Sequence, residues 1–96
     1  MGPAYPERAD VWWKSGELNI RVRGHFETDG YNVWVAADTQ QPLTYHVMQA
    51  RVPGLPASGA CPQPYDWVQV FPMRSPPGAI TMVDGNGTHR VNPSQQ

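Results

Sequence analysis

The clearest pattern in the chain is the alternation of hydrophobic and polar residues between positions 16 and 38. From Leu18 to Phe26 every second residue is apolar or glycine, and the residues between them are polar. The alternation returns at Val33 and continues through Val35. Because successive side chains of a strand point to opposite faces, this pattern predicts two half-buried β-strands.

The dipeptide Asp29-Gly30 separates the two alternating segments. Asp-Gly tolerates the positive φ angles of a two-residue type I′ turn, so we expect the segments to pair as a hairpin. The turn also sets the register, because a slip of one residue would mix the two faces. The opposing pairs would be Phe26–Val33, Gly24–Val35, His25–Trp34 and Arg21–Asp38.

Short strands with turn residues between them account for most of the remaining chain. Further strands are predicted at residues 11–14, 43–52, 65–73, 79–83 and 88–91. A helix is the alternative for 43–52, but the β-branched and aromatic content of this segment and its flanking prolines favour a strand. Segment 65–73 is apolar on both faces, with Trp67 on one and Val68 and Val70 on the other. We therefore expect a central strand with Trp67 in the core.

Six to seven short strands with turns about every ten residues are typical of an all-β domain. We expect a small antiparallel β-sandwich of immunoglobulin-like type, although the Cys-Trp-Cys landmark of that fold is absent; a small β-barrel is the alternative. Residues 1–10 would form an extended N-terminal arm, 11–92 a single β domain and 93–96 a polar tail. The prolines between 53 and 64 predict a long loop there.

Charge and hydropathy narrow the range of partners. The 96 residues suffice for one core, and the formal net charge is −1. The basic residues, six arginines and Lys14, are mostly spaced singly along the chain, so we expect no nucleic-acid partner. No apolar run reaches membrane-spanning length, so we expect no membrane insertion. The sequence shows no signal peptide, which fits either a cytoplasmic protein or a secreted or periplasmic domain whose leader has been removed.

Candidate catalytic and metal-binding residues are few. Cys61 is the sole cysteine, which excludes an intrachain disulfide and a CxxC site. His25, His46 and His89 do not stand at ligand spacing, and no serine lies in a G-x-S-x-G motif. We therefore expect no catalytic residue, no metal and no cofactor. A small enzyme built on the three histidines or on Cys61 remains the alternative.

The aromatic residues give the better indication of function. In the predicted hairpin Trp34 lies on the polar face beside His25, with Arg21 and Arg23 on the same face. Tryptophan and arginine dominate the energetics of protein interfaces, so we interpret these four residues as a binding surface for another protein. The competing interpretation is that a loop, the N-terminal arm or a second sheet covers Trp34.

A pair of adjacent tryptophans extends the candidate surface. Trp12 and Trp13 are adjacent, so on a strand they point to opposite faces, and at most one of them can enter the core. We include Trp13 among the binding residues.

Taken together, these features predict a non-enzymatic binding or accessory module. A carbohydrate-binding module is the alternative, with Trp34 as the stacking platform and Asn32, His25 and Asp38 as polar neighbours.

Overall fold

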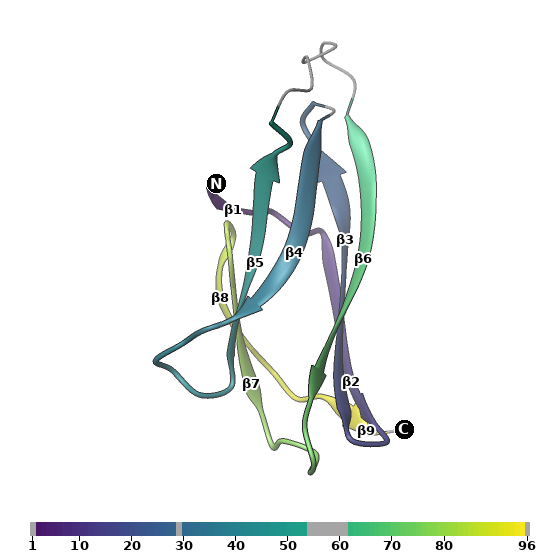
Figure 1. Ribbon diagram of the computed structural model, residues 1–96, viewed down its shortest axis with the longest axis vertical. Helices are drawn as coiled ribbons and strands as arrows, with labels where there is room; N and C mark the ends of the chain where they lie inside the picture. Colours follow the sequence, from purple (N-terminus) through teal and green to yellow (C-terminus); the bar gives the residue numbers. More distant parts are fainter. Residues whose placement is uncertain (1, 29, 54–61, 96) are drawn as a thin grey trace.

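The computed structural model describes residues 2–28, 30–53 and 62–95, which form strands, turns and loops. The strands are β1 (Gly2–Pro3), β2 (Arg8–Lys14), β3 (Glu17–Phe26), β4 (Tyr31–Ala37), β5 (Thr44–Arg51), β6 (Gln63–Pro72), β7 (Ile80–Asp84), β8 (Gly87–Val91) and β9 (Ser94–Gln95) (Figure 1). Within these ranges no helix is long and apolar enough to cross a membrane. The predicted all-β class is confirmed.

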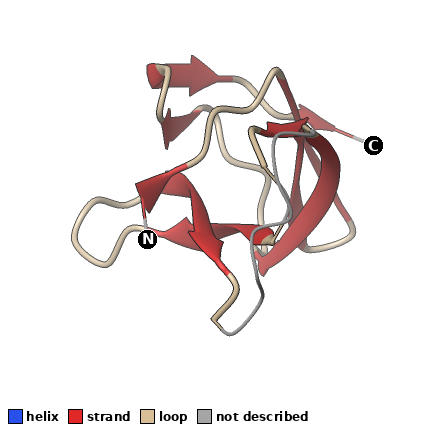
Figure 2. Cartoon of the chain, turned by 90° about the horizontal axis from the view of Figure 1, so that it is seen from above, coloured by secondary structure: helices blue, strands red, loops and turns tan. Residues whose placement is uncertain are grey.

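The strands pair into two sheets that share one core (Figure 2). In the first, called the β4–β5 sheet, β5 pairs with β4 along one side and with β1 and β7 along the other, and β8 pairs with β7. In the second, called the β3–β6 sheet, the order is β6-β3-β2-β9. The arrangement is a small β-sandwich. The immunoglobulin-like assignment stays a prediction.

Both sheets are mixed, whereas we expected purely antiparallel ones. β5 pairs with β7 in parallel, and β2 pairs with β9 in parallel. β9, near the C-terminus, closes the far edge of the β3–β6 sheet, whereas β1, near the N-terminus, pairs with β5 in the antiparallel sense. Residues 8–10 also belong to β2, which begins before the predicted position 11.

The predicted burial pattern of β3 and β4 is confirmed. Leu18, Ile20 and Val22 are fully buried, and the residues between them are partly exposed. Val33 and Val35 are buried on β4 in the same alternating way. The two apolar rows face each other across the sandwich, together with core residues from the other strands. These include Val11, Tyr45, Val47, Ile80 and Met82.

The predicted pairing of β3 with β4 is wrong. β3 pairs with β2 and β6, and β4 pairs with β5, so the connection through Gly30 crosses from one sheet to the other. Gly30 has a φ of 84°, as the prediction requires, but Asp29 lies outside the described residues. The tight two-residue hairpin is found instead at Ser15-Gly16 between β2 and β3, where both residues have positive φ.

The predicted central position of β6 is also wrong. β6 pairs with β3 and forms the edge of its sheet. Trp67 is 43% exposed, so it is not a core residue, and Val68 and Val70 are exposed as well. β4 is the corresponding edge of the other sheet. The two open edges position the site described below.

Candidate functional site

The edges of β4 and β6 lie side by side along one flank of the sandwich and border a groove of about 510 Å3 (Figure 1). The lining residues come from β3, β4 and β6: Phe26, Tyr31, Asn32, Val33, Trp34, Pro64, Tyr65, Asp66 and Trp67. Five of these side chains are aromatic. The groove therefore offers large apolar surfaces between two strands whose outer edges pair with no other described strand.

The backbone groups of β4 alternate between its neighbour β5 and the open edge. Two bonds fix this alternation: the Asp38 amide donates to the Thr44 carbonyl (2.8 Å), and the Val52 amide donates to the Gly30 carbonyl (2.7 Å). Even-numbered residues of β4 thus form the hydrogen-bonded pairs with β5, and odd-numbered residues direct their amide and carbonyl groups outward. The outward-directed residues are Tyr31, Val33, Val35 and Ala37. None is proline, so this edge is uninterrupted.

The open edge of β6 is bounded by prolines. The Met73 amide donates to the Gly16 carbonyl (2.8 Å), so odd-numbered residues of β6 pair with β3 and even-numbered residues face the open edge. Pro64 and Pro72 both occupy outward-directed positions, where they have no N–H to donate. The outward-directed amides between them belong to Asp66, Val68 and Val70. β6 is therefore a poorer template for a further strand than β4.

Trp34 and Trp67 reach the groove from different sheets. Trp67 stands on the inward side of β6 opposite Val22, but the edge position of its strand leaves it partly in solvent. Its Nε1 donates to Oε1 of Gln69 at 2.9 Å, so the one polar group of the indole is satisfied. Trp34 stands on the outer side of β4 opposite Met48 and is half-buried. Both rings are available for contact with a bound molecule.

The five predicted binding residues are distributed over both sheets. Arg21, Arg23 and His25 lie on the outer side of β3, whereas Trp34 lies on the outer side of the opposite sheet. The predicted contact of His25 with Trp34 is wrong because their strands are not paired. Trp13 points inward on β2, where its Nε1 donates to the Met73 carbonyl oxygen at 2.8 Å. These residues do not form one continuous surface.

Each basic side chain on the outer side of β3 is paired with a carboxylate. The pairs are Arg21–Asp66 at 2.8 Å, Arg23–Asp10 at 2.8 Å and His25–Glu7 at 2.6 Å. The predicted pair of Arg21 with Asp38 is wrong. The hydrogen bond from Arg21 lowers the pKa of the Asp66 carboxyl below its usual value, and it holds Asp66 at the rim of the groove.

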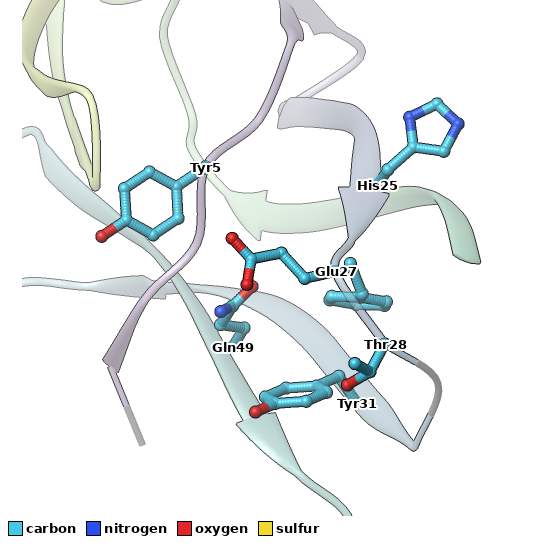
Figure 3. Close-up of a pocket in the computed structure, with 7 residues that line it drawn as sticks. Tyr5, His25, Glu27, Thr28, Tyr31 and Gln49 are labelled. Atoms are coloured by element: carbon cyan, nitrogen blue, oxygen red, sulfur yellow. The ribbon is translucent and has the colours of Figure 1, made fainter. Parts of the chain in front are cut away.

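A second cavity of about 490 Å3 adjoins the groove and shares Phe26 and Tyr31 with it. Its remaining lining residues are Tyr5, His25, Glu27, Thr28 and Gln49. Figure 3 shows Tyr5, on the segment between β1 and β2, and Tyr31 on different sides of this cavity. The Glu27 side chain extends into the space between them, and the His25 ring turns away (Figure 3).

The predicted carbohydrate-binding set is only partly assembled. Trp34 and Asn32 line the same groove. Asp38 lies elsewhere: its carboxylate is 2.7 Å from Nε2 of His46 and accepts hydrogen bonds from the amides of Gln40 and Gln41. His25 lines the second cavity and not the groove.

The three histidines lie apart, each beside a different carboxylate. The pairs are His25–Glu7, His46–Asp38 and His89–Asp84. In the described ranges no three histidine, aspartate, glutamate or cysteine side chains lie close enough together to hold a metal ion. Cys61, the thiol considered for an enzyme, lies outside these ranges.

Sequence reasoning missed Trp67, Tyr5 and Tyr31 as members of the site. For Trp67 a signal was present: Pro64 and Pro72 stand eight positions apart on the same parity, which is typical of an edge strand whose open side lacks donors. For Tyr5 no local signal exists, since its position depends on contacts with the distant turn that joins β7 to β8.

The comparisons with known proteins give no relative. No family matches the chain, no curated protein matches it, and no solved structure matches it.

Proposed function

We propose that this chain is a non-enzymatic protein-binding module that takes up an extended segment of a partner protein along the β4 edge. One observation carries the proposal: the uninterrupted edge of β4 lies beside a groove lined by five aromatic side chains. A segment in β conformation would pair with Tyr31, Val33 and Val35 through their outward-directed backbone groups.

The side chains of such a segment would contact both tryptophans. Alternate residues of a strand point to opposite faces, so one set would lie toward Trp34 on the outer side of the sheet. The other set would lie toward Trp67 and Tyr65, inside the groove. Backbone bonds would supply affinity for any extended chain, and the aromatic contacts would supply preference for large apolar side chains.

The test starts from a display library of random peptides of about eight residues, the usual length of a strand. Peptides selected on the wild-type chain are titrated against Trp34→Ala and Trp67→Ala, and affinity is read by calorimetry. We expect each variant to weaken binding about tenfold or more, as is typical of aromatic anchors at an interface. Trp12→Ala is the matched control, because Trp12 lies on the outer side of β2, away from the groove.

N-methylation of the selected peptide separates strand addition from simple apolar contact. Only every second amide of an added strand faces β4, so blocking successive amides should reduce affinity with a period of two residues. The proposal is contradicted if selected peptides bind Trp34→Ala and Trp67→Ala as tightly as wild type. It is equally contradicted if N-methylation has no periodic effect.

A carbohydrate-binding module is the second candidate. It is supported by Trp34, Trp67 and the Asn32 amide lining one groove, since aromatic faces with neighbouring polar groups suit sugar rings. Tryptophan fluorescence in the presence of a panel of polysaccharides tests it. Saturable quenching that is lost in Trp67→Ala would support this candidate, and a flat response across the panel would remove it.

A further inference from the structure

The cavity between Tyr5 and Tyr31 collects polar groups that have no partner in the described part of the chain. The side chains of Glu27, Gln49, Thr28 and both tyrosines line it, and their polar groups form no hydrogen bond or ion pair with a described residue. Most other carboxylates in the described ranges are paired, Glu17 being the exception. Glu7, Asp10, Asp38, Asp66 and Asp84 each pair with an arginine or a histidine.

The aromatic walls of the cavity are held in position by the fold. The Tyr31 ring stacks on Phe26 with a centroid distance of 5.7 Å and an interplanar angle of 25°. Tyr5 is 55% exposed, yet the residues on either side of it are anchored. The Ala4 amide donates to the Val47 carbonyl at 2.9 Å, and on the other side the Asn86 side chain donates to the Pro6 carbonyl at 3.1 Å.

Gly85 makes room for the Tyr5 ring. The ring lies against the backbone of Gly85, where an added β-carbon would come within 2.3 Å of a ring carbon. The Gly85 amide in turn donates to the Ala4 carbonyl. An exposed tyrosine fixed from both sides in this way has lost much of its conformational freedom before any ligand arrives, so less is lost on binding.

We propose that this cavity binds an organic cation, a guanidinium or ammonium group, with Glu27 as its counter-ion and the rings of Tyr5 and Tyr31 as its walls. A carboxylate and aromatic faces both attract a positive charge. The Gln49 carbonyl oxygen and the Thr28 hydroxyl can accept the remaining N–H groups. An anion would be repelled by Glu27. The His25 ring turns away from the cavity (Figure 3). Its Nδ1 lies 2.6 Å from a carboxylate oxygen of Glu7.

This inference goes beyond the proposed function, because Glu27, Tyr5 and Gln49 do not line the groove that the partner segment would occupy. The cation can be carried by a basic side chain of a protein or by a free small amine. The chemistry is the same in both cases. Comparing N-acetyl-arginine methylamide with butylguanidinium distinguishes the two sources, since tighter binding of the first indicates a peptide-borne cation and tighter binding of the second a free one.

The test is an NMR titration of the full chain with these two compounds and with N-acetyl-citrulline methylamide, the neutral analogue of the first. We expect saturable shifts of the Glu27, Thr28 and Gln49 amide signals with the cations and none with the citrulline compound. Glu27→Gln should weaken cation binding about tenfold, as expected when one charge-assisted hydrogen bond becomes a neutral one. Gly85→Ala should weaken it as well, by displacing Tyr5 without altering Glu27.

Two controls make the result specific. Glu17→Gln removes a carboxylate that has no side-chain partner in the described ranges and lies at the opposite end of β3 from the cavity, so affinity should be unchanged. Trp67→Ala, which impairs the groove alone, should also leave cation binding unchanged. A loss of peptide binding can therefore be distinguished from a loss of cation binding. The inference is overturned if no cation gives saturable shifts, if the citrulline compound binds equally well, or if Glu27→Gln retains wild-type affinity.

Discussion

The ring of Tyr65 lies directly against the backbone of Gly24. A β-carbon placed at Gly24 would come within 2.6 Å of the Tyr65 hydroxyl oxygen and within 2.8 Å of a ring carbon. The two residues are partners across the β3–β6 ladder, and Phe26 packs on the same tyrosine ring at a centroid distance of 4.7 Å. Gly24 does not have a positive φ, so close approach and not backbone conformation requires glycine here.

Gly24→Ala should destabilise the fold. The added methyl group overlaps a buried ring that is confined by Phe26, so the ring or the strand must shift. We expect the free energy of unfolding to fall by about 1–3 kcal/mol, the usual range for overpacking. Urea unfolding followed by tryptophan fluorescence measures it. Gly78→Ala is the control, because nothing lies within 4 Å of a β-carbon at Gly78, and an equal loss in both variants would contradict this account.

Tyr65→Phe should be neutral or stabilising. The Tyr65 hydroxyl is buried and has no hydrogen-bond partner among the residues that the structure describes, so it has lost its contacts with water without replacing them. Removing the hydroxyl should raise the free energy of unfolding by up to about 1 kcal/mol. The measurement is urea unfolding at neutral pH. A clear loss of stability in this variant would show that the hydroxyl forms a favourable contact in solution.

The same residue should make the fold sensitive to alkali. Burial, together with the nearby negative charges of Glu7 and Asp84, raises the pKa of Tyr65 from 10.0 to about 12. Between these two pH values the unfolded chain loses the tyrosine proton while the folded chain retains it. The free energy of unfolding should therefore fall as pH rises through this interval. Below this interval Tyr65 should cause no change of stability with pH.

Comparison of wild type with Tyr65→Phe isolates this effect. Urea unfolding at about pH 9 and about pH 11 should show a smaller loss of stability for the variant than for wild type. Some loss should remain, because burial also raises the pKa of Tyr45. Equal losses in both proteins would mean that Tyr65 does not titrate as expected.

Asp38 should contribute to stability at neutral pH and lose that contribution in acid. The hydrogen bond to His46 and those from the amides of Gln40 and Gln41 lower the pKa of Asp38 from 3.8 to about 2. Well above pH 3.8 the carboxylate is ionised in both the folded and the unfolded state, and its full contribution is present. As pH falls toward 2 the unfolded chain takes up the proton first, so the contribution disappears.

Asp38→Asn tests this prediction, because the amide keeps the size of the side chain but carries no charge. The urea midpoint should be lower than that of wild type at neutral pH, and the difference should shrink as pH falls from 4 to 2. Glu17→Gln is the matched control, since this carboxylate has no side-chain partner in the described ranges. A constant difference over the whole pH range would contradict the prediction.

The alternation of residues predicted which side chains of β3 and β4 are buried, but not which strands are neighbours. An apolar row on each of two consecutive strands is buried equally well when the strands pair within one sheet and when they face each other across a sandwich. The positive φ of Gly30 is compatible with both arrangements. The sequence of the turn therefore could not distinguish a hairpin from a crossing between sheets, and the contact of His25 with Trp34 depended on the wrong choice.

The candidate site was predicted only in part, again because the alternation of residues does not show which strands are neighbours. Trp34 was identified from its place on the polar face of β4, and this place is correct. Trp67 was assigned to the core because both faces of β6 are apolar, although apolar residues also occur on an exposed edge. The outward-directed prolines of β6 carried the missing information, whereas the approach of Tyr5 to Gly85 joins segments that are distant in the sequence and leaves no local pattern.

Pro64 and Pro72 also bear on how copies of this chain behave at high concentration. An exposed, flat strand with valine and tryptophan side chains is a hazard, since identical strands of other molecules can add to it and grow into fibrils. A copy that approached β6 would find a missing donor at each end of the strand, so a continuous ladder could not extend along it. These two residues thereby disfavour ordered aggregation through β6 while leaving β4 free of the same restriction.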